Sequence, residues 1–189
     1  MPDVAGRPAP VPDVAGRPAP VPDVAGGLVL HVTFICSGNI CRSPIAEKMF
    51  AHQLRERGLG GVVRVTSAGT GGWHEGEPAD RRAGHVLRAH GYPSEHRAAQ
   101  MDDDHLSADL VVALGRNHLR MLQHMGVPAE RLRMLRSFDP KSGAHALDVE
   151  DPYYGTQDDF EDVYAVIDAA LPGLHSWVDE RLRERKQVS

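Results

Sequence analysis

The sequence predicts an α/β domain in which helices cover both faces of a mostly parallel sheet. From residue 28 onward, apolar segments of strand length alternate with amphipathic segments of helix length, which is the pattern of βα units. The first apolar segment, LVLHVTFIC, has almost no polar alternation, as expected of a strand buried on both faces. The composition, 41% hydrophobic and 25% charged, is that of an ordinary globular domain.

The first half of the domain contains two strand–helix pairs. A strand is predicted at 28–36, and the helix after it ends near Gly58, a residue type that favours helix C-termini. This helix places four apolar side chains on one face: Ile45, Met49, Phe50 and Leu54. A second strand is predicted at 62–69 and a second helix at 80–90.

Four further elements follow along the chain: a strand at 108–114, a helix at 117–125, a short strand at 131–138 and a helix at 158–185. The last helix is expected to break at Pro172 and Gly173. Residues 139–156 show no periodicity and predict a long loop, which is a typical location for functional residues.

Residues 1–27 differ in composition and predict a disordered, proline-rich tail. Residues 2–11 read PDVAGRPAPV, and residues 12–21 repeat them without a change. No aromatic residue precedes Phe34, so the segment has little to bury. A tandem duplication or a misassigned start codon explains the repeat more simply than a docking function. The folded domain is therefore placed at 28–186.

Composition and charge exclude several classes of function. The formal net charge is −5, whereas a main role in binding nucleic acid requires a basic face. No apolar run reaches the ~18 residues of a membrane span, so no integral membrane association is expected. Cys36 and Cys41 are too few for a four-cysteine zinc site or a disulfide framework, which favours a reducing, cytoplasmic environment. The 11 histidines form no metal-binding motif, and no metal site is expected.

The segment CSGNICRSP at 36–44 lies between the first strand and its helix, at the sheet edge where α/β proteins bind ligands. Ser43 fits the N-cap and Pro44 the first position of the helix, whose unpaired amides then face the loop. Gly38 and Asn39 tolerate unusual backbone angles. The loop can therefore curl its amides inward as an anion-binding nest.

Cys36 and Arg42 make this nest a candidate catalytic site. A cysteine in such a nest is stabilised as the nucleophilic thiolate. Arg42 offers a planar fork for two phosphoryl oxygens, which a lysine cannot match. Together they point to attack on a phosphate ester. The alternatives are a buried structural thiol at Cys36 and a surface salt bridge at Arg42.

Cleavage of a phosphate ester also requires an acid that protonates the leaving oxygen. The long loop offers three carboxylates: Asp148, Glu150 and Asp151. Asp151 is favoured because Pro152 stiffens the backbone after it, and Tyr153 and Tyr154 supply an aromatic wall. An acid on a separate loop can approach from the side opposite the thiolate, as in-line displacement requires. The alternative is a solvated loop carboxylate.

Three segments in family order, VTFICSGNICRSP, SAGTGGWHEGEPAD and DPYYG, make residues 30–183 resemble the low-molecular-weight protein-tyrosine phosphatases, above all their actinobacterial branch. The resemblance implies a flavodoxin-like three-layer sandwich with a four-stranded parallel sheet. It also implies a two-step mechanism without metal or cofactor. In it Cys36 forms a cysteinyl-phosphate that Arg42 holds, while Asp151 protonates the tyrosine oxygen and later activates water.

The resemblance assigns further residues of the site. The phosphate-binding loop would comprise Ser37, Gly38, Asn39, Ile40, Cys41 and Ser43. Within it Ser43 would hydrogen-bond the Cys36 sulfur and Asn39 would brace the loop, with Glu47 and His96 behind it. The substrate cleft would be lined by Trp73, His74, Tyr153 and Tyr154. The depth of this cleft would admit phosphotyrosine and exclude the shorter phosphoserine. The alternatives are that Trp73 is a core residue and that the two tyrosines only pack within the loop.

Two positions remain open or depart from the family. Cys41 lies five residues from Cys36, and in much of the family such a pair closes a reversible disulfide. A small apolar filler at Cys41 is the alternative. Gly115 stands where the family often has an aspartate, a loss that should cost loop rigidity but removes no catalytic group.

The resemblance implies tyrosine-phosphorylated proteins as partners, a monomer, and a cytoplasmic location, with export without a signal peptide left open. Two rival functions are less well supported. An arsenate reductase on the same fold requires downstream cysteines, and none follows Cys41. A catalytically silent phosphotyrosine-binding module is expected to lack Cys36 or Asp151, and the chain keeps both.

Overall fold

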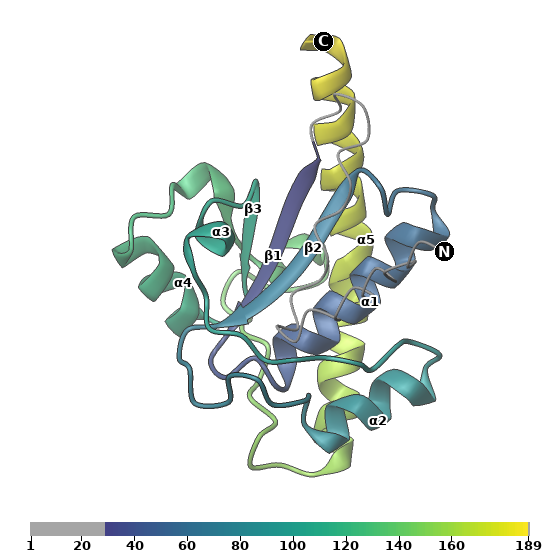
Figure 1. Cartoon of the computed structure of the whole chain (residues 1–189), viewed down its shortest axis with the longest axis vertical. Coiled ribbons are helices and arrows are strands. Elements are labelled where there is room, and N and C mark those ends of the chain that lie inside the picture. Colours follow the sequence, from purple (N-terminus) through teal and green to yellow (C-terminus); the bar gives the residue numbers. More distant parts are fainter. Residues whose placement is uncertain (1–28, 189) are drawn as a thin grey trace, which may run out of the picture.

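The computed structural model describes residues 29–188, so the predicted tail at 1–27 lies outside the described residues. Within them a four-stranded parallel sheet has the order β2-β1-β3-β4 (Figure 1). The strands are β1 (Leu30–Cys36), β2 (Val63–Gly69), β3 (Leu110–Ala113) and β4 (Leu132–Met134). The helices are α1 (Arg42–Glu56), α2 (Arg81–Ala89), α3 (Asp103–Leu106), α4 (Arg116–His124) and α5 (Gln157–Val188), with short 3-10 turns η1 (Ala129–Arg131) and η2 (Leu135–Phe138).

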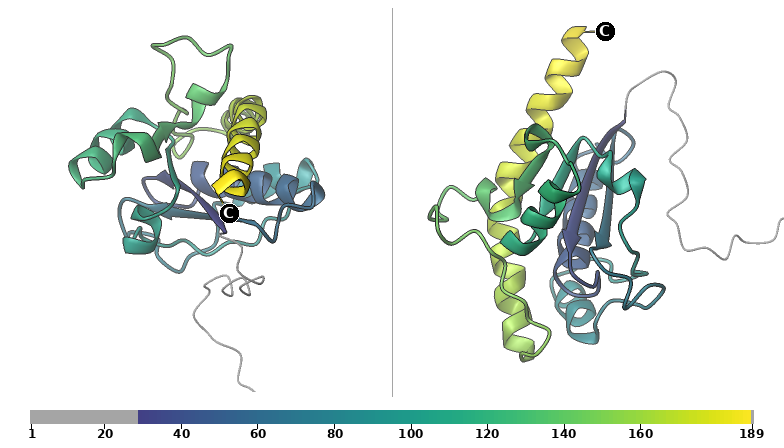
Figure 2. Two further views of the ribbon diagram at one scale, coloured as in Figure 1. Left: turned by 90° about the horizontal axis from the view of Figure 1, so that it is seen from above. Right: turned by 90° about the vertical axis from the view of Figure 1, so that its left-hand side faces the viewer.

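The sheet separates two apolar cores, and helices lie on both of its sides (Figure 2). Successive side chains of a strand point to opposite faces. On β1, Phe34 accordingly joins the core formed with α1, α2 and α5, whereas Ile35 joins the core that contains Leu122 of α4. The predicted three-layer α/β fold with a four-stranded parallel sheet is confirmed.

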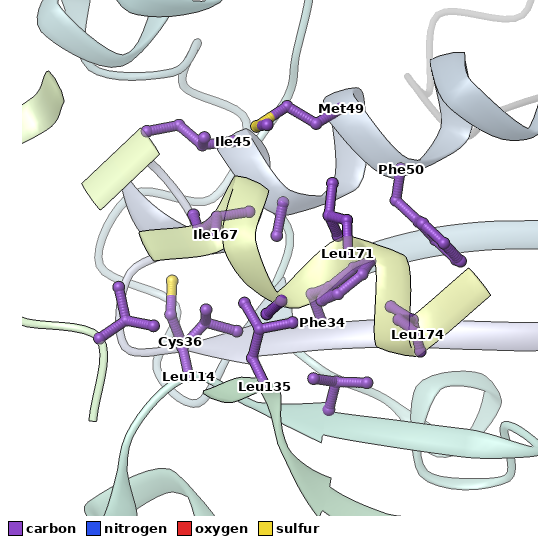
Figure 3. Packing of buried hydrophobic residues seen from close by; sticks show 14 of the residues in the cluster. Phe34, Cys36, Ile45, Met49, Phe50, Leu114, Leu135, Ile167, Leu171 and Leu174 are labelled. Carbon is purple, nitrogen blue, oxygen red and sulfur yellow. The ribbon is translucent and has the colours of Figure 1, made fainter. Parts of the chain in front are cut away.

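The larger core fixes β1 between α1 and α5. The rings of Phe34 and Phe50 meet edge to face, with their centroids 5.9 Å apart. Ile167 and Leu171 of α5 lie over the same strand, Ile167 near Cys36 and Leu171 near Phe34 (Figure 3). The strand that carries Cys36 is therefore held by elements from both ends of the domain.

The predicted break at Pro172 and Gly173 is wrong, because α5 runs through both residues as one helix. Leu171 and Leu174 on either side are fully buried, and this packing outweighs the hydrogen bond that proline cannot make. A Cβ on Gly173 would lie 2.0 Å from the Phe138 carbonyl oxygen. The glycine therefore allows α5 to lie directly against η2 rather than ending the helix.

The predicted strand at 131–138 is also too long, since only Leu132–Met134 pairs as β4 and the chain then turns into η2. Leu132 packs in the α4-side core, whereas Leu135 and Phe138 pack in the core under α5. Three-residue spacing places both η2 side chains on one side of a 3-10 turn. The chain thus leaves the strand in order to fill the opposite core.

The loop after β1 lies at the point where the sheet order diverges. β1 pairs with β2 on one side and with β3 on the other, so their connections leave in opposite directions (Figure 1). In doubly wound sheets this switch point, at the carboxyl ends of the strands, is the place where ligands bind. In the described part of the chain, no helix is long and apolar enough to cross a membrane.

Candidate active site

The loop at 37–41 joins the end of β1 to the start of α1 and leaves its amides free. Asn39 has a φ of 57°, the left-handed backbone that the sequence suggested for this loop. Among residues 29–188, no backbone amide of 37–41 donates a hydrogen bond to another protein group. Buried, unpaired amides beside a helix N-terminus are typical of an anion-binding site.

A pocket of about 240 Å³ opens over this loop and collects most of the predicted site residues. Its lining comprises Cys36, Ser37, Gly38, Ile40, Cys41, Arg42, Trp73, His74, Asp151, Tyr153 and Tyr154. The four remaining predicted residues, Asn39, Ser43, Glu47 and His96, do not line the pocket. The structure therefore separates the predicted residues into a lining set and a supporting set.

Cys36 ends β1 with only 2% of its surface exposed, at the base of the pocket. Its Sγ lies 2.8 Å from the Ser43 hydroxyl. Cys41 is also buried, and burial together with the nearby Asp80 raises the pKa of its thiol well above the usual range. Both cysteines are free thiols, so the disulfide between them stays a prediction.

Ser43 is not the N-cap of the helix, and this prediction is wrong. The helix already begins at Arg42, and Cys41 occupies the cap position without a side-chain hydrogen bond. The Ser43 hydroxyl instead contacts the Cys36 sulfur and accepts a 2.8 Å hydrogen bond from Asn39 Nδ2. A serine next to a helix start was read as a cap, whereas the loop uses its hydroxyl for tertiary contacts.

Asn39 holds the loop by its side chain and its backbone. Its Nδ2 donates to the hydroxyls of Ser43 and Ser67, at 2.8 and 2.9 Å, and its Oδ1 accepts from the Ala99 amide at 2.9 Å. All the hydrogen-bonding atoms of this fully buried amide group thus point to neighbouring segments.

Glu47 and His96 extend the same network behind Asn39. His96 Nε2 donates to the Asn39 carbonyl oxygen at 2.8 Å, and its Nδ1 lies 3.6 Å from Glu47 Oε2. Glu47 Oε2 also accepts from Ser67. Burial lowers the pKa of His96, while the Glu47 carboxylate acts in the opposite direction.

Arg42 and Asp151 bring the loop and the long segment at 139–156 together. Arg42 is 6% exposed, and its Nη1 donates to the Val149 carbonyl oxygen at 3.0 Å. Its Nη2 lies 3.5 Å from Asp151 Oδ2. The Asp151 side chain is half exposed and lines the pocket, so it can reach both solvent and a ligand.

The other two carboxylates of this segment are placed differently. Asp148 accepts from the Arg116 amide at 2.6 Å and so holds the start of α4. Glu150 is exposed and lies outside the lining of the pocket. Of the three candidates, Asp151 is the one that the structure brings to Cys36 and Arg42.

Aromatic rings form the rim of the pocket. Trp73 is 73% exposed, which rules out the core position considered for it. Tyr153 meets Tyr154 edge to face at 4.9 Å, and the His74 ring lies 6.2 Å from that of Tyr153. A Cβ on Gly38 would lie 2.9 Å from His74 Cδ2, so the glycine lets this ring approach the loop.

Three comparisons with known proteins agree. The family model described as "Low molecular weight phosphotyrosine protein phosphatase" matches residues 31–188. The chain belongs to this family.

The relatives support the same assignment along nearly the whole domain. The chain is 73% identical over 153 residues to "Low molecular weight protein-tyrosine phosphatase A" of Mycobacterium tuberculosis H37Rv, covering 81% of this chain and 94% of that one. It is 47% identical over 163 residues to the "Low molecular weight protein-tyrosine-phosphatase" of Streptomyces coelicolor, with 84% and 99% covered. The crystal structure of YfkJ from Bacillus subtilis matches with a TM-score of 0.76 at 31% identity, covering 82% of this chain and 98% of that chain. The predicted resemblance and the predicted hydrolase class are confirmed.

Two residues of this low-molecular-weight phosphatase escaped the sequence analysis. Ser67 of β2 links Asn39 to Glu47. His118 of α4 lies 2.9 Å from the Ser37 hydroxyl through Nε2, and burial and then the Arg42 charge lower its pKa to about 4. The signal for His118 was its place just after the third strand, at the edge where the carboxyl ends of the strands meet.

At Gly115, where the family often has an aspartate, Asp148 of the long loop supplies a nearby carboxylate. Gly115 is buried, and a Cβ on it would lie 3.4 Å from Asp148 Oδ1 and 2.8 Å from Asn117 Oδ1. A carboxylate from the long loop thus reaches the neighbourhood of the missing aspartate and binds the Arg116 amide. No residue that lines the pocket depends on the change.

Asn39→Ala is expected to lower the free energy of unfolding by about 3 kcal/mol, because three side-chain hydrogen bonds are lost and alanine must keep a left-handed backbone. Urea unfolding measures the difference. Asn39→Gly is the matched control, since it loses the same hydrogen bonds without the backbone strain and should be more stable than Asn39→Ala. Wild-type stability in Asn39→Ala would contradict the bracing role.

Within residues 29–188, no group of three or more His, Cys, Asp or Glu side chains is arranged to hold a metal ion. The groups that the site brings together are the Cys36 thiol, the Arg42 guanidinium, the Asp151 carboxyl and the free loop amides.

Proposed function

We propose that this member of the low-molecular-weight protein-tyrosine phosphatases hydrolyses phosphotyrosine in proteins through Cys36. The observation that carries the proposal is the meeting of Cys36, Arg42 and Asp151 in one pocket beneath an aromatic rim. These are a nucleophile, a phosphoryl clamp and a proton donor, supplied by two segments that lie more than a hundred residues apart in the chain.

In the first step the Cys36 thiolate attacks phosphorus, and the tyrosine oxygen leaves from the opposite side. Arg42 binds two phosphoryl oxygens through its fork, and the free amides of 37–41 bind the oxygens as charge develops on them. Asp151 gives its proton to the tyrosine oxygen. The phosphorus–oxygen bond breaks as the phosphorus–sulfur bond forms, which yields a cysteinyl-phosphate.

In the second step a water molecule attacks the same phosphorus and displaces the sulfur. Asp151, now a carboxylate, removes the proton from that water. The Ser43 hydroxyl, 2.8 Å from Sγ, stabilises the sulfur anion as it leaves. Inorganic phosphate departs, and the thiolate is ready for another cycle.

The shape of the pocket supports selectivity for tyrosine. Cys36 lies at the base with 2% of its surface exposed, while Trp73 and Tyr154 stand at the rim with 73% and 96% exposed. A phosphate must therefore be carried inward on a long, flat side chain. The aryl ring of phosphotyrosine has this reach and can contact the rim, whereas phosphoserine is too short.

The partners follow from this activity. Tyrosine-phosphorylated proteins are the substrates, and we propose that the enzyme acts as a cytoplasmic monomer. The single pocket lining described above comes from one chain, so a second copy is not required for the chemistry.

Phosphate release from one peptide carrying either phosphotyrosine or phosphoserine tests the proposal, with EDTA present throughout. We expect turnover of the phosphotyrosine form only, unaffected by EDTA. Equal turnover of the two peptides would contradict the depth argument. If the protein bound the phosphotyrosine peptide without any turnover, it would be a phosphotyrosine-binding module rather than an enzyme.

A further inference from the structure

Helix α2 carries a row of basic side chains on the side that faces away from the core. Ala83, Val86 and Leu87 are fully buried against the domain. Arg81, Gly84, His85 and Arg88 follow the i, i+3, i+4, i+7 spacing of a single helix face, and the three side chains on it are exposed. Figure 1 places α2 at the end of the molecule where the chain enters α5.

A hollow of about 700 Å³ lies along this basic row. Gly84 contributes to its floor, and a Cβ there would lie 3.0 Å from Arg88 Nη1. The Arg88 guanidinium therefore folds back across the helix over the glycine. Because glycine is less favourable than alanine within a helix, this position lowers helix stability while making room for the guanidinium.

Among residues 29–188, the two arginines of the basic row, Arg81 and Arg88, have no carboxylate partner. In the described part of the chain, Arg81 and Arg88 form no ion pair, and Arg88 Nη1 donates only to the Ser94 hydroxyl, at 3.0 Å. Asp80, the acidic residue of the lining, is already bound by the Arg82 guanidinium. The hollow thus keeps unneutralised positive charge in a protein whose formal net charge is −5.

Hydrogen bonds from Arg82 and Asp80 link the hollow to the segments that line the pocket over Cys36. Arg82 lines the hollow, and its guanidinium donates to the carbonyl oxygens of Tyr153 and Gly155 at 2.9 and 2.8 Å. The Asp80 amide donates to the carbonyl oxygen of Ile40, in the phosphate-binding loop, at 2.8 Å. A peptide whose phosphotyrosine enters the pocket can therefore lay its next residues against α2.

We propose that this hollow binds acidic side chains that flank the phosphotyrosine of a protein substrate. The proposal rests on the proposed function and names a feature of its substrates. Charge complementarity selects carboxylates, since the guanidinium forks of Arg81 and Arg88 are paired with no carboxylate of residues 29–188. The volume, larger than the 240 Å³ of the catalytic pocket, suits several residues of an extended chain rather than one small anion.

The test compares two phosphotyrosine peptides that differ only in having glutamate or glutamine at the flanking positions. Wild type is expected to show a kcat/KM roughly fivefold higher for the glutamate peptide at low salt, a difference that shrinks as salt is added. In Arg81→Gln/Arg88→Gln the preference should disappear. Free phosphotyrosine, which does not reach the hollow, should be hydrolysed equally by both proteins.

The matched control is Arg120→Gln/Arg183→Gln, which removes two exposed arginines elsewhere and changes the net charge equally. This control should keep the wild-type preference for the glutamate peptide. If it lost that preference as fully as Arg81→Gln/Arg88→Gln does, the preference would come from the overall charge of the protein, and the proposal would be overturned. A preference unchanged in Arg81→Gln/Arg88→Gln would also overturn it. If wild type failed to hydrolyse free phosphotyrosine, the proposed function would fail; fluorescence anisotropy of the same two peptides would still decide whether the hollow binds acidic residues.

Discussion

Cys36→Ser is expected to lower kcat for a phosphotyrosine peptide by at least about 10⁴-fold while leaving peptide binding largely intact. A serine hydroxyl at this position is a far weaker nucleophile than a thiolate. The phosphate would still meet Arg42 and the free amides of the loop. Phosphate release gives kcat, and fluorescence anisotropy of a labelled peptide gives Kd.

Cys41→Ser provides the matched control, because it makes the same atomic exchange in the same loop. Burial raises the pKa of the Cys41 thiol, so the group stays protonated and supplies no nucleophile. Under reducing conditions this variant should lose far less activity than Cys36→Ser. If both variants were folded and lost activity to a comparable extent, the loop would tolerate no serine at either position. The assignment of Cys36 as the nucleophile would then lose its support.

Asp151→Asn is expected to lower kcat by about 10²–10³-fold for a phosphotyrosine peptide, and by much less for an aryl phosphate whose phenol is strongly acidic. An amide cannot protonate the leaving oxygen, so the loss grows with the basicity of that oxygen. The measurement is kcat across a series of aryl phosphates. Wild type should depend only weakly on the leaving group, and the variant steeply.

Glu150→Gln is the control for the loop, since it removes the adjacent charge from a side chain outside the pocket. Its leaving-group dependence should match that of wild type. If Glu150→Gln instead produced the steep dependence and Asp151→Asn did not, the acid would be misassigned. Equal shallow slopes for all three proteins would exclude Asp151 and Glu150 as the proton donor.

The parts of the site that the sequence predicted are those encoded by neighbouring residues. Cys36 and Arg42 lie within one short loop between a buried strand and an amphipathic helix, so residue type and spacing were sufficient. Asp151 required a choice among three carboxylates, which the loop alone could not make. The fold favours Asp151, because it directs Asp148 to the start of α4 and Asp151 to the pocket.

The parts that could not be predicted depend on contacts between distant segments. Ser67 and His118 reach the loop from β2 and α4; nothing in its local sequence marks Ser67, and the only signal for His118 is its position just after the third strand. The errors have the same origin. Pro172 was expected to end a helix, yet burial of its neighbours keeps α5 continuous, and Ser43 was expected to cap a helix, yet Asn39 and Cys36 take its hydroxyl.

The packing of α5 over β1 has a consequence for the newly made chain. Protein synthesis runs from the N-terminus at about 5–20 residues per second, so Cys36 is made roughly 7–30 s before Val178, the last residue of the core that encloses it. Until then α5 cannot cover the strand (Figure 3). During this interval the part of the core that α5 supplies is missing, so the apolar face of β1 stays uncovered on the nascent chain.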